Sequence, residues 1–185
     1  MSQKQQTLKK VAKAAYYIAK TMRILLYVAT GIMVAALSLV LVYPEQRLEM
    51  WGISSNSTVS LGPLIADIRM GHEEMICLLS TSIVSVIITT VTLLYLGAIF
   101  KAIKNNDSPF DIGNIVRLKR AAISIALLSI IPSLVGVVVA AILGTTGFTS
   151  LNVDVTLIVM AFFFLCLAYI FEYGAELQKQ SDETL

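Results

Sequence analysis

Long stretches without charged residues are the feature that most constrains how this chain can fold. Residues 24–43, 75–100 and 121–153 contain no Asp, Glu, Lys or Arg, and a fourth stretch, 155–171, follows the single Asp154. An α-helix rises 1.5 Å per residue, so about 20 apolar residues cross a hydrocarbon core about 30 Å thick. The first three stretches meet this length, and the fourth meets it if Asp154 lies at the headgroup level. The sequence therefore predicts four membrane spans.

Composition supports the same class. The chain has 185 residues, of which 57% are hydrophobic and 14% charged, whereas soluble domains carry about 25% charged residues. We expect an all-α, integral membrane four-helix bundle with an N-terminal basic amphipathic helix, in which Lys9, Lys13 and Lys20 face away from an apolar stripe. That helix is expected to lie along the inner leaflet and then to turn into the first span. The alternative is that these lysines only fix the orientation of the chain in the membrane.

The distribution of positive charge predicts the orientation. Twelve of the 14 Lys and Arg residues lie in the N-terminal segment, in residues 101–120 or in the tail, and only Arg47 and Arg69 lie elsewhere. Because cytoplasmic loops are enriched in Lys and Arg, both termini are expected in the cytoplasm. The predicted order is a cytoplasmic amphipathic helix (1–23), span 1 (24–43), an external loop (44–74), span 2 (75–100), a cytoplasmic connection (101–120), span 3 (121–143), a short external loop (144–154), span 4 (155–172) and a cytoplasmic tail (173–185).

Chemically active groups are scarce. No Asp, Glu, Lys, Arg or His lies within the four apolar stretches, whereas ion-coupled transport and proton relays usually need one. The only histidine, His72, stands beside Glu73 and Glu74 without zinc-ligand spacing, and we expect these residues to form a solvated first turn of the second helix. We therefore predict no enzyme activity, no catalytic residue, no metal and no cofactor. Direct nucleic-acid binding is not expected, because no basic stripe is interleaved with aromatic residues.

Small residues recur at helical spacing within the spans, which favours close helix packing in lipid. Their hydroxyl groups are expected to bond to carbonyl groups one turn back, and Pro132 is expected to kink the third span. A polar conduit is the alternative. It would be lined by four hydroxyl side chains of the second and third spans: Ser82, Ser85, Thr89 and Ser133.

The cytoplasmic connection and the tail hold the most distinctive residues. Asp107 or Ser108 can cap a helix that has Pro109 at its first position. Two carboxylates one turn apart in the tail repel each other unless cations stand opposite, so Glu172 and Glu176 are expected to pair with Arg117 and Arg120. The candidate interaction rim on the cytoplasmic side consists of seven residues: Pro109, Phe110, Asn114, Arg117, Arg120, Glu172 and Glu176.

Two short motifs within this region resemble a known family. Ser108-Pro109-Phe110 with Asn114, Arg117 and Leu118, and later Ile170-Phe171 with Gly174–Gln178 and Asp182–Thr184, are similar to the signatures of a bacterial membrane family catalogued as domain of unknown function 2975. The resemblance implies a four-span protein of the bacterial cytoplasmic membrane. It also implies a gene often next to one for a small Cro/C1-type helix-turn-helix regulator. It supplies no activity and no catalytic residue.

Two functions of different classes follow. The first is an interaction or sensor protein that holds a small helix-turn-helix regulator through the connection and the tail. Helix capping and ion pairing at the rim would account for the same residues without a partner. The second is a small transporter, channel or peptide-immunity protein that uses the interior of the bundle or the external loop. The lipid bilayer is the only partner that both functions require.

Overall fold

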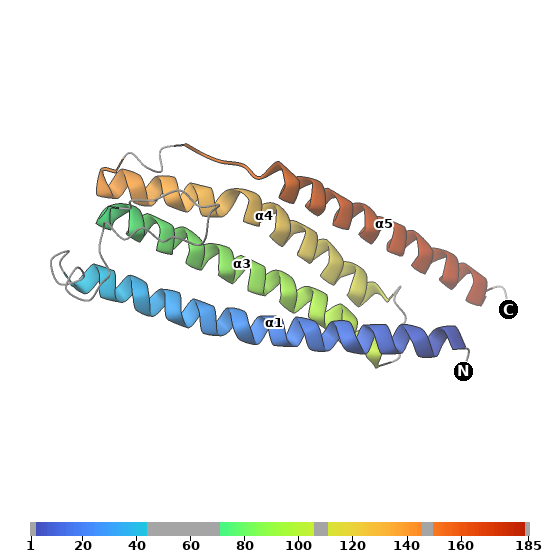
Figure 1. The fold of residues 1–185 in the computed structure, drawn as a ribbon. Helices are drawn as coiled ribbons and strands as arrows, with labels where there is room; N and C mark the ends of the chain where they lie inside the picture. The colour runs from blue at the N-terminus through green and yellow to red at the C-terminus, as the bar shows by residue number, and fades with distance from the viewer. Residues whose placement is uncertain (1–2, 44–70, 106–110, 146–149, 184–185) are drawn as a thin grey trace, which may run out of the picture. The chain divides into compact units, whose positions relative to one another are not determined.

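The computed structural model describes residues 3–43, 71–105, 111–145 and 150–183, which form four α-helices and, within these ranges, no strand. The helices are α1 (Gln3–Val42), α3 (His72–Lys104), α4 (Ile112–Leu143) and α5 (Val155–Glu183), shown in Figure 1. The prediction of an all-α chain built on four long apolar helices is confirmed. The predicted external loop falls mostly on residues 44–70, which lie outside the described residues.

Each of the four helices is long and apolar enough to cross a membrane: Lys10–Val42, His72–Lys104, Ile112–Leu143 and Val155–Ser181. Many large aliphatic and aromatic side chains on them are exposed, among them Ile32, Ile142 and Phe162 at 65%, 78% and 68%. Such exposure is unfavourable in water and favourable against lipid tails. The chain is therefore a multi-pass membrane protein.

The first helix differs from its prediction in one respect. Helix α1 runs without interruption from Gln3 to Val42, so the expected turn between residues 23 and 24 is absent. Ala12 and Ala19 are buried, whereas Val11 and Ile18 are more than 60% exposed. The apolar stripe is thus divided, with alanines at the helix contact and larger side chains facing outward. No helix-breaking residue stands at the predicted turn, and continued backbone hydrogen bonding favours a single rod.

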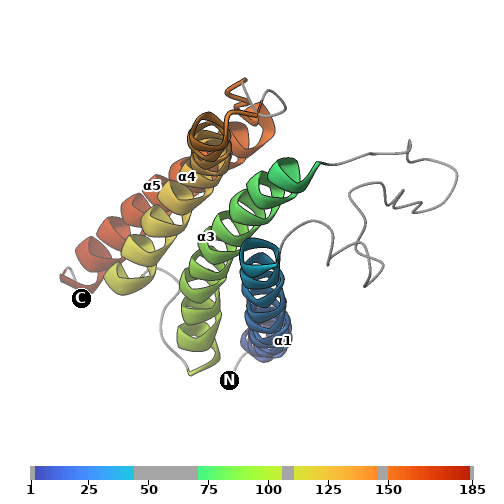
Figure 2. The same cartoon turned by 90° about the vertical axis from the view of Figure 1, so that its left-hand side faces the viewer.

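The described helices divide into two compact units, each of which has its own contacts. Unit 1 contains residues 1–28, 87–129 and 154–185, and unit 2 contains residues 29–86 and 130–153. In unit 1 the helices lie side by side in the order α1, α3, α4 and α5 (Figures 1 and 2). Lys104 at the end of α3 lies 5.0 Å from the ring centre of Tyr16 on α1, a cation–π contact that joins the first two helices.

The interior of unit 1 is built from small and polar residues as well as apolar ones. Gly97 of α3 is buried against α1, where a Cβ atom would lie 3.5 Å from the guanidinium of Arg23 and 3.7 Å from Ala19. Thr92 of α3 and Ser124 of α4 share a buried hydrogen bond of 2.8 Å. Close backbone approach and interhelical hydrogen bonds are the two devices that membrane helices use for association.

The fourth helix begins beside the middle of α4. The Ser129 hydroxyl donates to the Asp154 carbonyl over 2.9 Å, and the Asp154 N–H donates to the Ser129 carbonyl over 3.4 Å. The Asp154 carboxylate accepts hydrogen bonds from the N–H groups of Thr156 and Leu157, which caps α5. Asp154 therefore lies alongside α4, a neighbour that the sequence did not indicate.

Unit 2 has a small apolar core in which all three of its helices take part. Val40 of α1 and Ile76 of α3 are buried, and Val139 and Leu143 of α4 pack against them. Helix α3 begins with Glu73 and Glu74 in its first turn, and the Glu74 carboxylate accepts a hydrogen bond of 3.2 Å from Gly71 N–H. The predicted first turn of the second helix is confirmed.

Candidate functional site

The predicted rim contains an ion pair between α4 and α5, but its cation differs from the predicted one. Lys119 Nζ lies 2.9 Å from Glu172 Oε2 and 3.1 Å from Oε1, and also 4.8 Å from the ring centre of Tyr169. The prediction that Glu172 pairs with Arg117 or Arg120 is wrong. Successive residues of a helix point about 100° apart, so Lys119 faces α5 while Arg120 is exposed.

Asn114 and Arg117 interact with each other. Asn114 is 1% exposed, and its Oδ1 accepts a hydrogen bond of 2.9 Å from Arg117 Nη1. Asn114 also borders an apolar cavity of about 200 Å³ whose other walls include Leu118 and Phe171. These contacts make Asn114 an interior residue of unit 1, so it is unsuited to the surface contact that the sequence suggested.

The remaining rim residues divide between exposed and undescribed positions. Arg120 and Glu176 are exposed, and neither forms an ion pair within the described part of the chain. Pro109 and Phe110 lie outside the described residues, as do Asp107 and Ser108. Helix α4 begins at Ile112.

Asp111 caps α4 at the first position that the structure describes before the helix. Its Oδ2 accepts a hydrogen bond of 3.0 Å from Gly113 N–H, and its carbonyl accepts from Asn114 and Ile115. A Cβ atom on Gly113 would lie 2.8 Å from that carboxylate, so a glycine suits this turn. The sequence offers several Asp and Ser residues before α4, and capping preference alone does not choose among them.

The C-terminal part of α5 presents a feature that the sequence reasoning missed. The helix continues eleven residues beyond Glu172 to Glu183, and Ile170, Tyr173 and Leu177 on it are 62%, 64% and 48% exposed. These residues are spaced i, i+3 and i+7, so they lie along one face of the helix. The same spacing is visible in the sequence and could have indicated an apolar stripe that continues from the predicted fourth span into the predicted tail.

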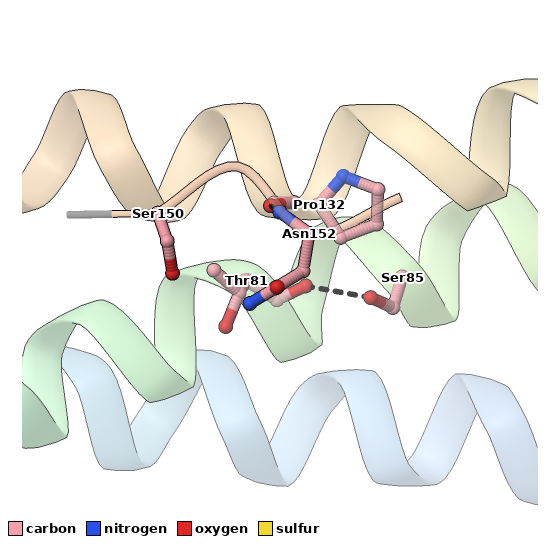
Figure 3. A pocket seen from close by; sticks show the side chains of 7 residues that line it. Thr81, Ser85, Pro132, Ser150 and Asn152 are labelled. Carbon is pink, nitrogen blue, oxygen red and sulfur yellow. Dashed lines mark hydrogen bonds between the residues drawn. The ribbon is translucent and has the colours of Figure 1, made fainter. Parts of the chain in front are cut away.

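Unit 2 holds a second candidate site, a polar pocket of about 370 Å³ (Figure 3). Its walls come from α3, from α4 and from the non-helical residues before α5. The lining residues are Thr81, Ser85, Pro132, Ser133, Gly136, Ser150 and Asn152. None of them is charged.

The pocket includes two of the four hydroxyl groups that the conduit hypothesis named. Ser85 and Ser133 line it, while Ser82 and Thr89 are not among its lining residues. Ser85 donates to the Thr81 carbonyl, as expected for a hydroxyl in a membrane helix. Ser133 instead accepts a hydrogen bond of 2.7 Å from Asn152 N–H. Ser150 and Asn152 were missed because nothing in the sequence indicates that the chain before span 4 lies against α4.

No protein-family model matches the chain, and neither a curated protein nor a solved structure matches it. The rim, the exposed apolar side chains near the end of α5 and the unit 2 pocket are therefore the features from which a function can be inferred.

Proposed function

We propose that the chain is an interaction or sensor protein of the bacterial cytoplasmic membrane that binds a small helix-turn-helix regulator on the cytoplasmic side. The observation that carries the proposal is the exposed stripe of Ile170, Tyr173 and Leu177 on the last part of α5. An amphipathic helix that offers anchors at i, i+3 and i+7 fits an apolar groove on a partner protein. We call this surface the α5 stripe.

The distribution of charge supports a cytoplasmic position for the stripe. The Lys and Arg residues of the N-terminal segment and of residues 101–120 would both face the cytoplasm under the positive-inside rule. Within unit 1, Glu172 at the start of the tail is paired with Lys119, which belongs to that positive connection. The tail and the connection therefore belong to the same side of the membrane, and both termini are cytoplasmic in this proposal.

Charge complementarity favours a basic partner. From Glu172 to Glu183 the helix carries four acidic residues, Glu172, Glu176, Asp182 and Glu183, and one basic residue, Lys179. A DNA-binding regulator has a positive surface for phosphate groups, so an acidic helix can compete with DNA for it. Binding to the α5 stripe would then hold the regulator at the membrane and away from DNA.

The resemblance to domain of unknown function 2975 supports the choice of partner. That family is a bacterial membrane family often encoded beside a small Cro/C1-type helix-turn-helix regulator. The motif residues Ile170, Phe171 and Gly174–Gln178 include or adjoin the α5 stripe. The proposal thus gives these residues a shared purpose, recognition of the regulator.

Affinity measurements with the purified full-length chain and the neighbouring regulator test this proposal. Replacing Tyr173 and Leu177 together with alanine is expected to weaken binding at least about tenfold, because truncated interface anchors typically cost more than 1 kcal/mol each. The matched control replaces Val159 and Phe163, an equally exposed pair one turn apart on the same helix, and should bind normally. Normal binding by the Tyr173 and Leu177 variant would show that the stripe is not the recognition surface.

The second candidate is a small transporter, channel or peptide-immunity protein, and the polar pocket of unit 2 favours it. Ser85 and Ser133 line this pocket together with three further polar side chains. Solute flux through the chain in lipid vesicles, lost on Ser133→Leu and retained in the Tyr173 and Leu177 variant, would favour this candidate. If the Tyr173 and Leu177 variant loses regulator binding and the unmodified chain shows no solute flux, the first candidate is favoured.

A further inference from the structure

The pocket of unit 2 has hydrogen-bonding groups that protein atoms do not use. Thr81 donates its hydroxyl proton to carbonyls one turn back, at 3.0 Å from Cys77 and 2.9 Å from Leu78. Ser133 acts only as an acceptor within the described residues, so its own proton remains available. The hydroxyl of Ser150 and the carboxamide of Asn152 likewise have no hydrogen-bond partner in the described chain, and Figure 3 shows both side chains directed toward α3.

The backbone beside the pocket is not helical. Residues 150–153 are non-helical and exposed, and they lie along α4, because Asn152 N–H is bonded to Ser133 Oγ. Ser133 precedes the end of α4 at Leu143 by ten residues, which is about 15 Å of helix rise and about half of a 30 Å hydrocarbon core. The segment therefore reaches well below the end of the helix.

Irregular backbone at this depth needs hydrogen-bond partners. Lipid tails offer none, so non-helical backbone within a membrane persists only where protein covers it or where it lines water. The described part of unit 2 does not cover this segment, since residues 150–153 are all exposed. The adjoining pocket of about 370 Å³ is far larger than the roughly 30 Å³ that one liquid water occupies.

We infer that the unit 2 pocket is a water-filled vestibule that opens beside the C-terminal half of α4 and reaches the level of Ser133. Water there bonds to the free groups of Ser133, Ser150 and Asn152 and to the exposed backbone of residues 150–153. Pro132 has no N–H to satisfy, which suits a hydrated helix face.

The uncharged lining decides what else the vestibule admits. Hydroxyl and amide groups offer both donors and acceptors, and no carboxylate or cation selects an ion of one sign. Small hydrophilic solutes can therefore enter irrespective of the sign of their charge. A neutral solute that forms hydrogen bonds can replace water, because the lining contains no ion pair that it would have to break. The vestibule is independent of regulator binding and of the orientation proposed above.

Cysteine modification in permeabilised membrane vesicles tests the inference. Both native cysteines, Cys77 and Cys166, are first replaced with alanine, and Ser133, Ser150 or Leu134 is then replaced with cysteine. The probes are a cationic and an anionic methanethiosulfonate, which react with thiolates in water. Because thiolates form in water and not in hydrocarbon, Ser133→Cys and Ser150→Cys should react with both probes at least about tenfold faster than Leu134→Cys.

The control is matched in depth. Leu134 adjoins Ser133 on α4 and is 50% exposed, yet it does not line the pocket. Equally slow reaction of Ser133→Cys and Leu134→Cys would overturn the inference. Reaction at Ser150→Cys alone would also overturn it, because water would then not reach the level of Ser133. If Ser133→Cys fails to accumulate, Ser85→Cys on the opposite wall supplies the deep position, and the same comparison decides.

Discussion

The ion pair between Lys119 and Glu172 gives the sharpest test of how α4 and α5 meet. At 2.9 Å the Coulomb attraction of two unit charges in water is about 1.4 kcal/mol. The side chains are 33% and 51% exposed, so screening and the ordering of two flexible chains reduce the net contribution to about 0.2–1 kcal/mol. The ring of Tyr169, 4.8 Å from Lys119 Nζ, adds about 0.5–1 kcal/mol by a cation–π contact.

A double-mutant cycle separates these two contributions. Lys119→Gln loses both the ion pair and the ring contact, whereas Glu172→Gln loses only the ion pair. In the cycle that also includes the double variant, the ring contact cancels, and a coupling free energy of about 0.5 kcal/mol remains. The assay is the free energy of unfolding in mixed micelles titrated with a denaturing detergent. The coupling should shrink as salt rises from 0.01 M to 1 M, where the screening length falls from about 30 Å to about 3 Å.

Arg120 provides the matched control, because it is adjacent to Lys119 and exposed. The cycle of Arg120→Gln with Glu172→Gln should give a coupling near zero. In the charge reversals, Lys119→Glu with Glu172→Lys should recover stability that Arg120→Glu with Glu172→Lys does not. A coupling with Arg120 equal to or larger than that with Lys119 would refute the observed pairing and restore the expectation from sequence.

Three further predictions concern the helix contacts and a helix cap of unit 1. Thr92→Val and Ser124→Ala should show a coupling of about 0.6 kcal/mol in the same unfolding assay, the average for interhelical hydrogen bonds in membranes, and additive effects would contradict their 2.8 Å contact. Gly97→Ala should leave stability nearly unchanged, since its Cβ would make ordinary contacts of 3.5 Å. Gly97→Leu should destabilise the chain by more than about 1 kcal/mol, and equal effects of the two variants would contradict the close approach of α1. Asp154→Ala should cost about 1 kcal/mol, the usual value of a lost N-cap, and Asp154→Asn should restore most of it.

The presence of four long apolar helices was predictable because the physics that sets it is local. In lipid, the backbone N–H and C=O groups of a charge-free stretch must form hydrogen bonds within that stretch, which makes it helical. The four helices therefore follow from composition and the rise per residue. The acidic first turn of α3 was also predictable, since Glu73 and Glu74 directly precede an apolar run. These features need no knowledge of how helices pack.

Features that depend on packing were not predictable. The choice of Lys119 over Arg120 as the partner of Glu172 depends on the rotation of α4 about its axis, which sequence spacing does not give. The burial of Asn114 depends on the same rotation. The start of α5 beside Ser129 depends on long-range hydrogen bonds between Asp154 and Ser129, and a rule based on length alone does not reveal such contacts.

The most direct test of the proposed function is site-specific photocrosslinking in cells that express the chain and the small helix-turn-helix regulator proposed as its partner. A photoreactive phenylalanine analogue is placed at Leu177, on the α5 stripe, or at Ile158, which is also exposed but lies in the apolar part of the same helix. The account predicts a crosslinked adduct with the regulator from position 177 and none from position 158. No adduct from position 177, or equal adducts from both positions, would contradict it.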